Sequence, residues 1–166
     1  MKRVVFAIDP GPTESAFVVW DGTSLRDFGK LPNNEMLHRL IAAAQGECTE
    51  LAVERVRGYG MAVGKEVFET CEWGGRFMQA WELLADNPIA SWLERRSVKL
   101  WLCGTCTAKD KNIRQALIDR VGPQGRKKSQ GPTYGVSGDV WAALGVAVTY
   151  FDKCELPSQT LANNTD

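Results

Sequence analysis

Five short runs of apolar residues predict the strands of one sheet. The predicted strands are residues 3–9, 16–20, 25–30, 50–53 and 98–103. The dipeptide Asp21-Gly22 is a strong hairpin signal, so the second and third runs are expected to pair as neighbours. The fourth run is expected to be central and parallel to the first.

Apolar residues at helical spacing predict the helices. The predicted helices are residues 36–45, 65–85, 108–121 and 139–151, with a short helical piece from Pro88 to about Arg96. The longest helix carries one apolar stripe, formed by Val67, Cys71, Gly74, Met78, Trp81 and Ala85. Gly74 and Gly75 in its middle each cost about 1 kcal/mol relative to alanine, so close backbone packing is expected there.

The order of these elements predicts a mixed α/β sheet with helices on both faces. Three hairpin-connected strands precede a helix–strand–helix–strand series and a closing helix. We find no internal repeat and no linker, so residues 1–154 are interpreted as one domain, large enough to bury a core. The polar residues 155–166 are predicted to form a disordered tail.

Composition excludes several classes of protein. No run reaches eighteen apolar residues, so no membrane contact is expected. The apolar stretch near the N-terminus is too short for a signal peptide and ends in a charge, which favours a cytoplasmic location, with a nucleoplasmic one as the alternative.

The five cysteines are scattered and odd in number, which is typical of a reducing compartment. Cys103 and Cys106 have CxxC spacing, but a structural zinc needs two more ligands, and His38 is the only histidine. Buried or partly buried thiols are therefore the favoured interpretation.

The net charge is zero, but its distribution is uneven. Residues 95–128 contain ten basic side chains and two acidic ones, Asp110 and Asp119, which gives a local charge of +8. Such a stretch suits a protein that holds a polyanion. The alternative is a solvated charged helix and loop.

Three carboxylates stand at the ends of buried elements. Asp9 ends the first strand before the turn Pro10-Gly11-Pro12, Glu54 ends the fourth strand, and Asp139 opens the last helix. If the two strands are parallel neighbours, both of their acids lie at one sheet edge, within reach of Asp139. Magnesium prefers oxygen ligands, and two such ions about 3.5–4 Å apart can serve phosphodiester chemistry. A turn residue, a surface charge and a helix cap are the alternative interpretation.

The order of these acids and helices resembles the RuvC family of Holliday-junction resolvases, which has the RNase H-like fold. The resemblance covers roughly residues 3–151 and includes Gly74-Gly75-Arg76 in the long helix. Its other motifs are Ala7-Ile8-Asp9-Pro10-Gly11, Leu51-Ala52-Val53-Glu54, residues 106–114 and residues 138–149. It implies a homodimeric, metal-dependent endonuclease that nicks branched DNA, such as a four-way junction, symmetrically.

The resemblance also implies roles for the acids. Asp9 would bridge two metals, Glu54 would bind one of them and Asp139 the other, with Mg²⁺ as the cofactor and Mn²⁺ as a substitute. The family usually has a further acid one turn along the last helix, where this chain has Ala142. Glu14 is a candidate replacement. An active enzyme is expected, and an inactive junction-binding descendant is the alternative.

The family places a basic residue near the start of the penultimate helix against the scissile phosphate. Lys109 and Lys111 both match that position, and Arg114 follows on the same helix. In the loop after Glu54, Arg57 could hold a phosphate and Tyr59 could stack on an unpaired base. Further phosphate contacts are expected from the loop residues Arg126, Lys127 and Lys128. Solvated side chains are the alternative for each.

The long helix, through Cys71, Gly74 and Met78, is the predicted dimer surface; packing of this stripe on its own sheet is the alternative. Three other functions stay open. The same fold could cut RNA–DNA hybrids or structured RNA, or the chain could bind junctions without cutting them. An ATPase domain of the actin and sugar-kinase type also has a first strand ending in Asp-x-Gly, but it needs two domains, more than 166 residues accommodate.

Overall fold

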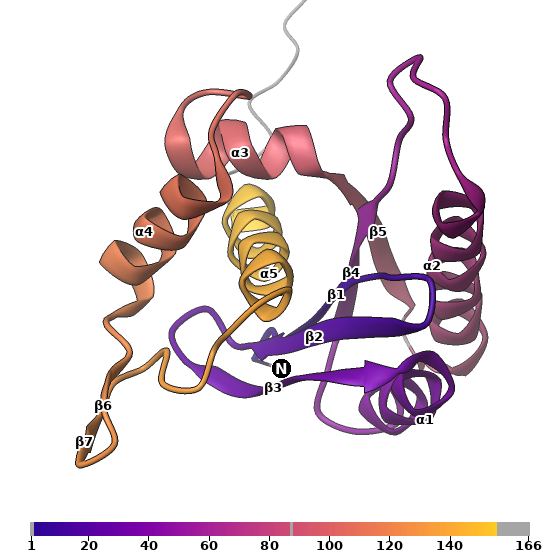
Figure 1. Ribbon diagram of the computed structural model, residues 1–166. Helices are drawn as coiled ribbons and strands as arrows, with labels where there is room; N and C mark the ends of the chain where they lie inside the picture. The colour runs from indigo at the N-terminus through magenta and orange to yellow at the C-terminus, as the bar shows by residue number, and fades with distance from the viewer. Residues whose placement is uncertain (1, 87, 156–166) are drawn as a thin grey trace, which may run out of the picture.

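A five-stranded sheet lies between two layers of helices in the computed structural model, which describes residues 2–86 and 88–155 (Figure 1). The sheet has the order β3-β2-β1-β4-β5. Its strands are β1 (Val5–Asp9), β2 (Glu14–Trp20), β3 (Leu25–Pro32), β4 (Glu50–Arg55) and β5 (Ile89–Glu94). The helices are α1 (Asn33–Ala44), α2 (Lys65–Leu84), α3 (Arg95–Cys103), α4 (Asp110–Val121) and α5 (Val140–Glu155).

The sheet is mixed, as predicted. Strands β1, β2 and β3 form an antiparallel meander, whereas β4 runs parallel to β1 and β5 runs parallel to β4. Helix α2 makes the crossover from β4 to β5, which a parallel pair requires. The parallel strands therefore end at one common edge of the sheet.

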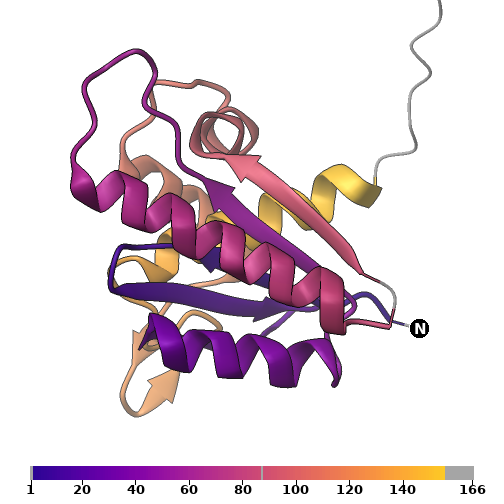
Figure 2. The same ribbon diagram turned by 90° about the vertical axis from the view of Figure 1, so that its right-hand side faces the viewer.

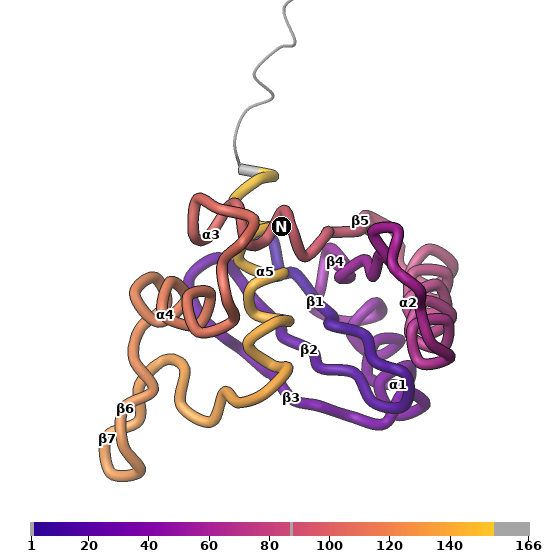
Figure 3. The backbone as a smooth tube through the Cα atoms, turned by 45° about the horizontal axis from the view of Figure 1, so that its top comes forward, coloured from indigo at the N-terminus to yellow at the C-terminus, as the bar shows by residue number. Residues whose placement is uncertain are grey.

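Alternation along the strands separates two cores. Phe6 and Ile8 point to the face that α1 and α2 cover, seen from that side in Figure 2. Val5 and Ala7 point to the other face, where α5 packs across β1 and β2 with α3 and α4 beside it (Figure 3). Asp9, the last residue of β1, follows Val5 and Ala7 in this alternation and therefore points to the α5 face.

The fifth strand was predicted in the wrong place. Residues 89–94 form β5 and residues 95–103 form α3, whereas the sequence pattern predicted a helix followed by a strand at 98–103. Leu93 and Trp92 pack on opposite faces of the sheet, as strand residues do. Val98 and Leu102 are four residues apart and both pack in the α5 core, which is helical spacing. The mixture of apolar and basic residues in this region satisfies both patterns.

Other boundaries differ by smaller amounts. Helix α5 continues to Glu155, so that residue is not part of the predicted tail, and residues 156–166 lie outside the described residues. The predicted loop after α4 contains a short hairpin, formed by β6 (Gly125–Arg126) and β7 (Ser129–Gln130). Among the described residues, no helix has the length and apolar composition needed to cross a membrane.

The two glycines of α2 have different surroundings. A Cβ atom at Gly74 would lie 3.1 Å from Cη2 of Trp92, so this glycine permits the close packing that the sequence predicted. A Cβ atom at Gly75 would have no neighbour within 4 Å. Only the first glycine is explained by packing within the chain.

Candidate active site

Asp9 and Glu54 lie on neighbouring strands at the edge where the parallel strands end. The register pairs Ile8 with Val53, so the next residue of each strand is one of the two acids. Both acids continue the alternation of Ala7 and Ala52, which point toward α5. The prediction that these strands are parallel neighbours is confirmed.

A buried polar network fixes the turn that follows Asp9. The Asn33 side-chain amide donates to the Gly11 carbonyl oxygen at 2.9 Å. The Ser15 hydroxyl donates to Asn33 Oδ1 at 2.6 Å and accepts the Gly11 N–H at 3.2 Å. The chain leaving β1 is therefore held rigidly, which restricts the backbone of Asp9.

Asp139 stands at the start of α5, one residue before its first helical residue. Its backbone carbonyl accepts hydrogen bonds from the N–H groups of Ala142 and Ala143, at 2.9 and 3.1 Å. Its carboxylate is close enough to Asp9 to raise the pKa of that acid. The start of α5 thus brings a third negative charge to the edge of the sheet.

The electrostatic environment of the two strand acids is unfavourable to their charged forms. Burial and then the Glu54 carboxylate raise the pKa of Asp9 to about 8, Asp139 adds to this, and Arg95 and Lys30 oppose it. Burial also raises the pKa of Glu54, against the effect of Arg95. A carboxyl group with a pKa this high is typical of functional sites.

Basic side chains pair with Glu54 and Asp139, the two acids on either side of Asp9 and called the outer acids below. Arg95 Nη1 lies 3.3 Å from Glu54 Oε2, and its Nη2 lies 2.7 Å from Asp110 Oδ1. Lys30 Nζ lies 2.8 Å from Asp139 Oδ2 and 3.7 Å from Glu14 Oε2. Within residues 2–86 and 88–155, the Asp9 carboxylate has no hydrogen bond or ion pair.

The donor set suits a hard divalent cation, although the acids are not gathered into a ready coordination shell. Among the described residues, no group of three or more His, Cys, Asp or Glu side chains is arranged to hold a metal ion. Asp9, however, is largely buried without a counter-ion, and a divalent cation binds carboxylate oxygens and favours their charged form. That Asp9, Glu54 and Asp139 share one metal site stays a prediction.

Glu14 lies toward the same edge as Asp139. Both carboxylates are within 4 Å of the Lys30 ammonium group, and Glu14 is about half exposed. The position one turn into α5, Ala142, offers no ligand. Glu14 therefore stays a candidate for a fourth acidic ligand, in place of the acid missing at Ala142.

The start of α4 is joined to the acidic edge. Asp110 shares the Arg95 guanidinium with Glu54, and Lys109 and Lys111 stand on either side of Asp110. The two lysines also line a cavity of about 450 Å³. Arg114 points elsewhere: it donates to Gln124 Oε1 at 2.8 Å, and its guanidinium carbon lies 5.2 Å from the Trp141 ring centroid.

The remaining predicted DNA-binding residues lie on two projections. Figure 1 shows the loop between β4 and α2 and the β6–β7 hairpin on opposite sides of the molecule. Figure 2 shows both on the side toward which β4 and β5 point. The predicted residues on them are Arg57 and Tyr59 in the loop, Arg126 in β6, and Lys127 and Lys128 in the turn of the hairpin.

Tyr59 and Arg57 differ in their freedom. Tyr59 is 59% exposed and has a φ angle of 45°, so its ring is not folded back on the domain. Arg57 Nη2 lies 2.7 Å from Glu94 Oε1 and would have to leave this partner, in part, to hold a phosphate. The side chains of Arg126, Lys127 and Lys128 are all exposed.

Sequence reasoning missed the cations of the site. Arg95 and Lys30 contact its outer acids, and the charge of Lys99 on α3 lowers the pKa of Glu54. In the fold, the residue before Arg95, Glu94, pairs with Arg55 next to Glu54, and this neighbourhood depends on the register of β4 and β5, which no local sequence pattern states. The misplaced fifth strand concealed this proximity.

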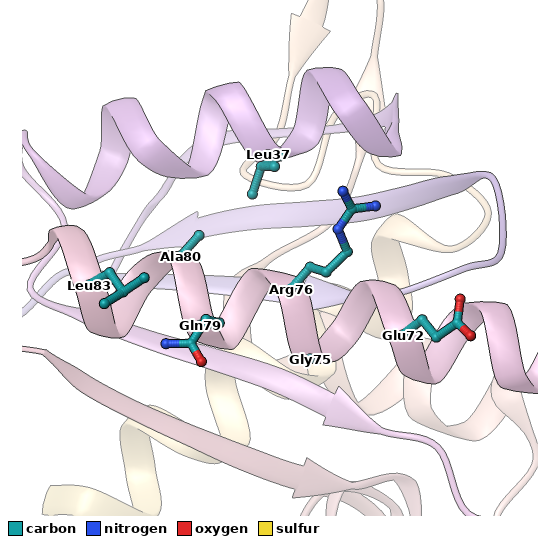
Figure 4. Close-up of a pocket in the computed structure, with 7 residues that line it drawn as sticks. All are labelled: Leu37, Glu72, Gly75, Arg76, Gln79, Ala80 and Leu83. Carbon is teal, nitrogen blue, oxygen red and sulfur yellow. The ribbon is translucent and has the colours of Figure 1, made fainter.

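The α2 residues predicted to form the dimer surface, Cys71, Gly74 and Met78, pack mostly within the chain itself. Gly74 and Met78 are buried against the sheet, and only Cys71 is exposed, because the helix turns a different face outward. That outer face forms, with Leu37 of α1, a groove of about 640 Å³ (Figure 4). The groove lies over the α1–α2 layer, on the opposite side of the sheet from α5.

Comparison with known proteins supports the fold. No protein-family model and no curated protein sequence matches the chain. The solved structure of RuvC from Thermus thermophilus matches with a TM-score of 0.67 and 18% identity, covering 91% of this chain and 95% of that chain. T. thermophilus RuvC in complex with a Holliday junction substrate matches with a TM-score of 0.66 and 18% identity, covering 92% of this chain and 94% of that one. The chain has the RNase H-like fold, in the arrangement found in RuvC.

Proposed function

We propose that this chain is a metal-dependent endonuclease that resolves four-way DNA junctions by paired nicks. The observation that carries the proposal is the pair Asp9 and Glu54, aligned at the carboxyl edge of parallel strands with Asp139 at the start of the helix above them. The similarity to a RuvC bound to a Holliday junction substrate adds support for branched DNA as the substrate class.

The acids would hold Mg²⁺, or Mn²⁺ in its place. When bound, the ion supplies charge stabilisation at the phosphate and a water of lowered pKa. Asp9 and Glu54 bind and orient this group from rigid strand ends, and Asp139 completes the set from α5. His38, the only histidine, is exposed on α1 across the sheet, so no imidazole assists as a general base.

The two projections suit a large, shaped polyanion. Figure 1 shows them on opposite sides of the molecule, and β1 and β4, whose ends carry Asp9 and Glu54, lie between them, so a strand entering the site would pass between the β4–α2 loop and the basic hairpin. Phosphate contacts from Lys109, Lys111 and the hairpin supply most of the affinity, and an exposed aromatic ring such as Tyr59 can stack on an unpaired base. Arg114 plays a smaller part because it already packs on Trp141.

Paired nicks require two active sites, which a homodimer provides. The exposed face of α2 is the surface we assign to this contact, because Phe68 and Leu83 on it are 60% and 73% exposed. Gly75 lies between them in sequence and lines the groove of Figure 4, and a Cβ atom there would have no neighbour within 4 Å, which allows a partner backbone to come close. Sedimentation equilibrium tests this surface: we expect the wild type to form a dimer and Leu83→Glu to stay monomeric. A wild type that stays monomeric at high concentration would contradict the assignment of this face to a dimer contact.

The test of function is cleavage of a synthetic four-way junction in Mg²⁺ or Mn²⁺. We expect symmetric paired nicks from the wild type and none from Asp9→Asn, which keeps the size of the side chain. Full activity in Asp9→Asn would contradict the proposal. A linear duplex, an RNA–DNA hybrid and a structured RNA are run in parallel, since preferential cleavage of either RNA substrate would select the RNA nuclease instead. Tight junction binding without cleavage in either metal would select a binding protein.

A further inference from the structure

Arg95 occupies an unusual position for a cation beside a candidate metal site. It is the first residue of α3 and follows β5 directly, and the pairing of Glu94 with Arg55 brings it to the end of β4. Its guanidinium is shared between Glu54 at 3.3 Å and Asp110 at 2.7 Å. The Arg95 side chain is 27% exposed and that of Glu54 is 12% exposed, so solvent screens their attraction only in part.

We propose that Arg95 is a positioning residue of the acidic site, which holds Glu54 in the metal-free protein and competes with a divalent cation for the same carboxylate. The inference rests on the proposed function in that it assumes a metal site at these acids. It deepens that function by naming the group that regulates metal entry.

Competition follows from the contacts of the two groups. An arginine stays charged at all working pH values, so it can leave Glu54 only by moving, not by losing its proton. Asp110 offers a second partner, because its Oδ1 lies 2.7 Å from the other Nη atom, although solvent screens this contact since the Asp110 carboxylate is 83% exposed. Arg95 therefore keeps one carboxylate contact at the edge after a cation takes Glu54.

A released guanidinium has donors free for another oxyanion. The planar fork of arginine suits the oxygens of a phosphate. A phosphodiester at the edge would therefore stabilise the arrangement in which Arg95 has left Glu54. By linkage, nucleic acid should then tighten the binding of the cation, and the cation should tighten the binding of nucleic acid by the same factor.

Lys30 offers a natural comparison on the other side of Asp9. It pairs with Asp139 at 2.8 Å, but these two side chains are 43% and 57% exposed. Exposed pairs contribute little, because solvent screens the charges and both side chains lose entropy. Lys30 should compete for the cation less strongly than Arg95.

The test measures Mn²⁺ affinity without nucleic acid, from the electron paramagnetic resonance signal of the free ion. We expect Arg95→Gln to bind Mn²⁺ about tenfold more tightly than the wild type, the effect of losing one close charge. Lys30→Gln should show a smaller gain. Arg96→Gln, which removes the neighbouring exposed charge, controls for net charge and should stay within about twofold. Unchanged or weaker Mn²⁺ binding in Arg95→Gln would overturn the proposal.

A second variant covers the case in which Arg95→Gln does not fold, which thermal melting reports. Asp110→Asn removes the second anchor, so Arg95 pairs with Glu54 alone and Mn²⁺ should bind more weakly than in the matched exposed variant Asp119→Asn. Equal affinity in these two variants would also refute the competition.

The results separate this inference from the proposed function. If Arg95→Gln binds Mn²⁺ more tightly but the protein cleaves no nucleic acid, the proposed role of Arg95 is supported and the proposed nuclease function is contradicted. If the wild type cleaves junctions but Arg95→Gln has an unchanged Mn²⁺ affinity, the nuclease function is supported and the proposed role of Arg95 is contradicted. In an active enzyme, we further expect Arg95→Gln to cut more slowly at saturating Mn²⁺ despite its higher affinity, a combination that simple structural damage does not produce.

Discussion

At the scale of single residues, Asp9 is a carboxyl group without a direct partner among the described side chains of the metal-free protein. It is largely buried next to Glu54, and no described side chain pairs with its carboxylate. Ionising a buried carboxyl group without a direct partner costs free energy, so the group tends to keep its proton instead. The metal-free site is therefore destabilised when Asp9 ionises, and a bound cation would relieve this cost.

This electrostatic cost predicts a pH dependence of stability. Because the pKa of Asp9 is raised to about 8 from its ordinary value of 3.8, the folded protein holds an extra proton between those pH values. Stability then falls as pH rises through that range. Asparagine does not ionise, so we expect metal-free Asp9→Asn to be more stable than the wild type by roughly 1–3 kcal/mol at pH 8, with the difference shrinking toward pH 4.

Urea unfolding at several pH values measures this difference. The exposed Asp86 gives the control, since Asp86→Asn should follow the wild type at every pH. Saturating Mg²⁺ should reduce the advantage of Asp9→Asn, because the ion stabilises only the wild type at this position. Parallel pH profiles for Asp9→Asn and the wild type would show that Asp9 is not electrostatically destabilised.

At the scale of secondary-structure elements, α2 shows how one helix serves two surfaces. Its inner face, which includes Thr70, Phe77 and Trp81, is buried against the sheet and α1. Its outer face carries Phe68 and Leu83, which are exposed. The adjacent glycines have different surroundings, since a Cβ atom would meet Trp92 at Gly74 and no atom within 4 Å at Gly75.

The two glycines provide a matched pair of substitutions. Alanine favours a helix by about 1 kcal/mol over glycine, so Gly75→Ala should stabilise the monomer by about that amount. Gly74→Ala gains the same propensity but forces the Trp92 ring, 3.1 Å from the new Cβ atom, to move. We expect it to be less stable than Gly75→Ala by about 1 kcal/mol or more in thermal unfolding. Equal stability of the two variants would mean that the contact with Trp92 is loose.

The elements also show what the sequence could predict. Strands β1, β2 and β4 were located correctly because each is a compact apolar run with a clear turn signal, and this was enough to align Asp9 with Glu54. Strand β5 was missed because Pro88 imitates a helix start, while Val98 to Cys103 mixes apolar and polar residues as an exposed helix also does. Local pattern does not distinguish these, since the choice depends on which residues the sheet and α5 bury.

The cations of the site were unpredictable for a related reason. Lys30 reaches the edge because β3 pairs it with Ala16, which in turn pairs with Asp9. That row across three strands depends on register, which no single stretch of sequence states. The acids carry a recognisable order along the chain, whereas their counter-ions are set only by the folded topology.

At the scale of the whole molecule, the chain combines zero net charge with a basic segment placed around an acidic edge. Some of this basic charge is neutralised internally, since Arg95 pairs with Glu54 and Arg120 pairs with Asp152. The hairpin side chains Arg126, Lys127 and Lys128 are exposed. They are therefore available to phosphate.

This distribution predicts how junction binding depends on salt. Each phosphate contact contributes about 0.9 to the slope of log affinity against log salt concentration. Replacing both Lys127 and Lys128 with glutamine should reduce the slope by about 1–2 and weaken binding of all DNA shapes alike. Fluorescence anisotropy in a salt series measures this, with Lys65→Gln on α2 as a control for a lysine outside the segment. A slope equal to that of the wild type would place the DNA away from the hairpin.

The location of a bound divalent ion tests the central claim most directly. A crystal soaked in Mn²⁺ gives an anomalous difference peak at each bound ion, independently of any assay of activity. The account predicts a peak coordinated by Asp9 and Glu54 with Asp139 on the same side, and its loss in Asp9→Asn. A map with no peak at this edge, or with Mn²⁺ bound only elsewhere, would contradict it.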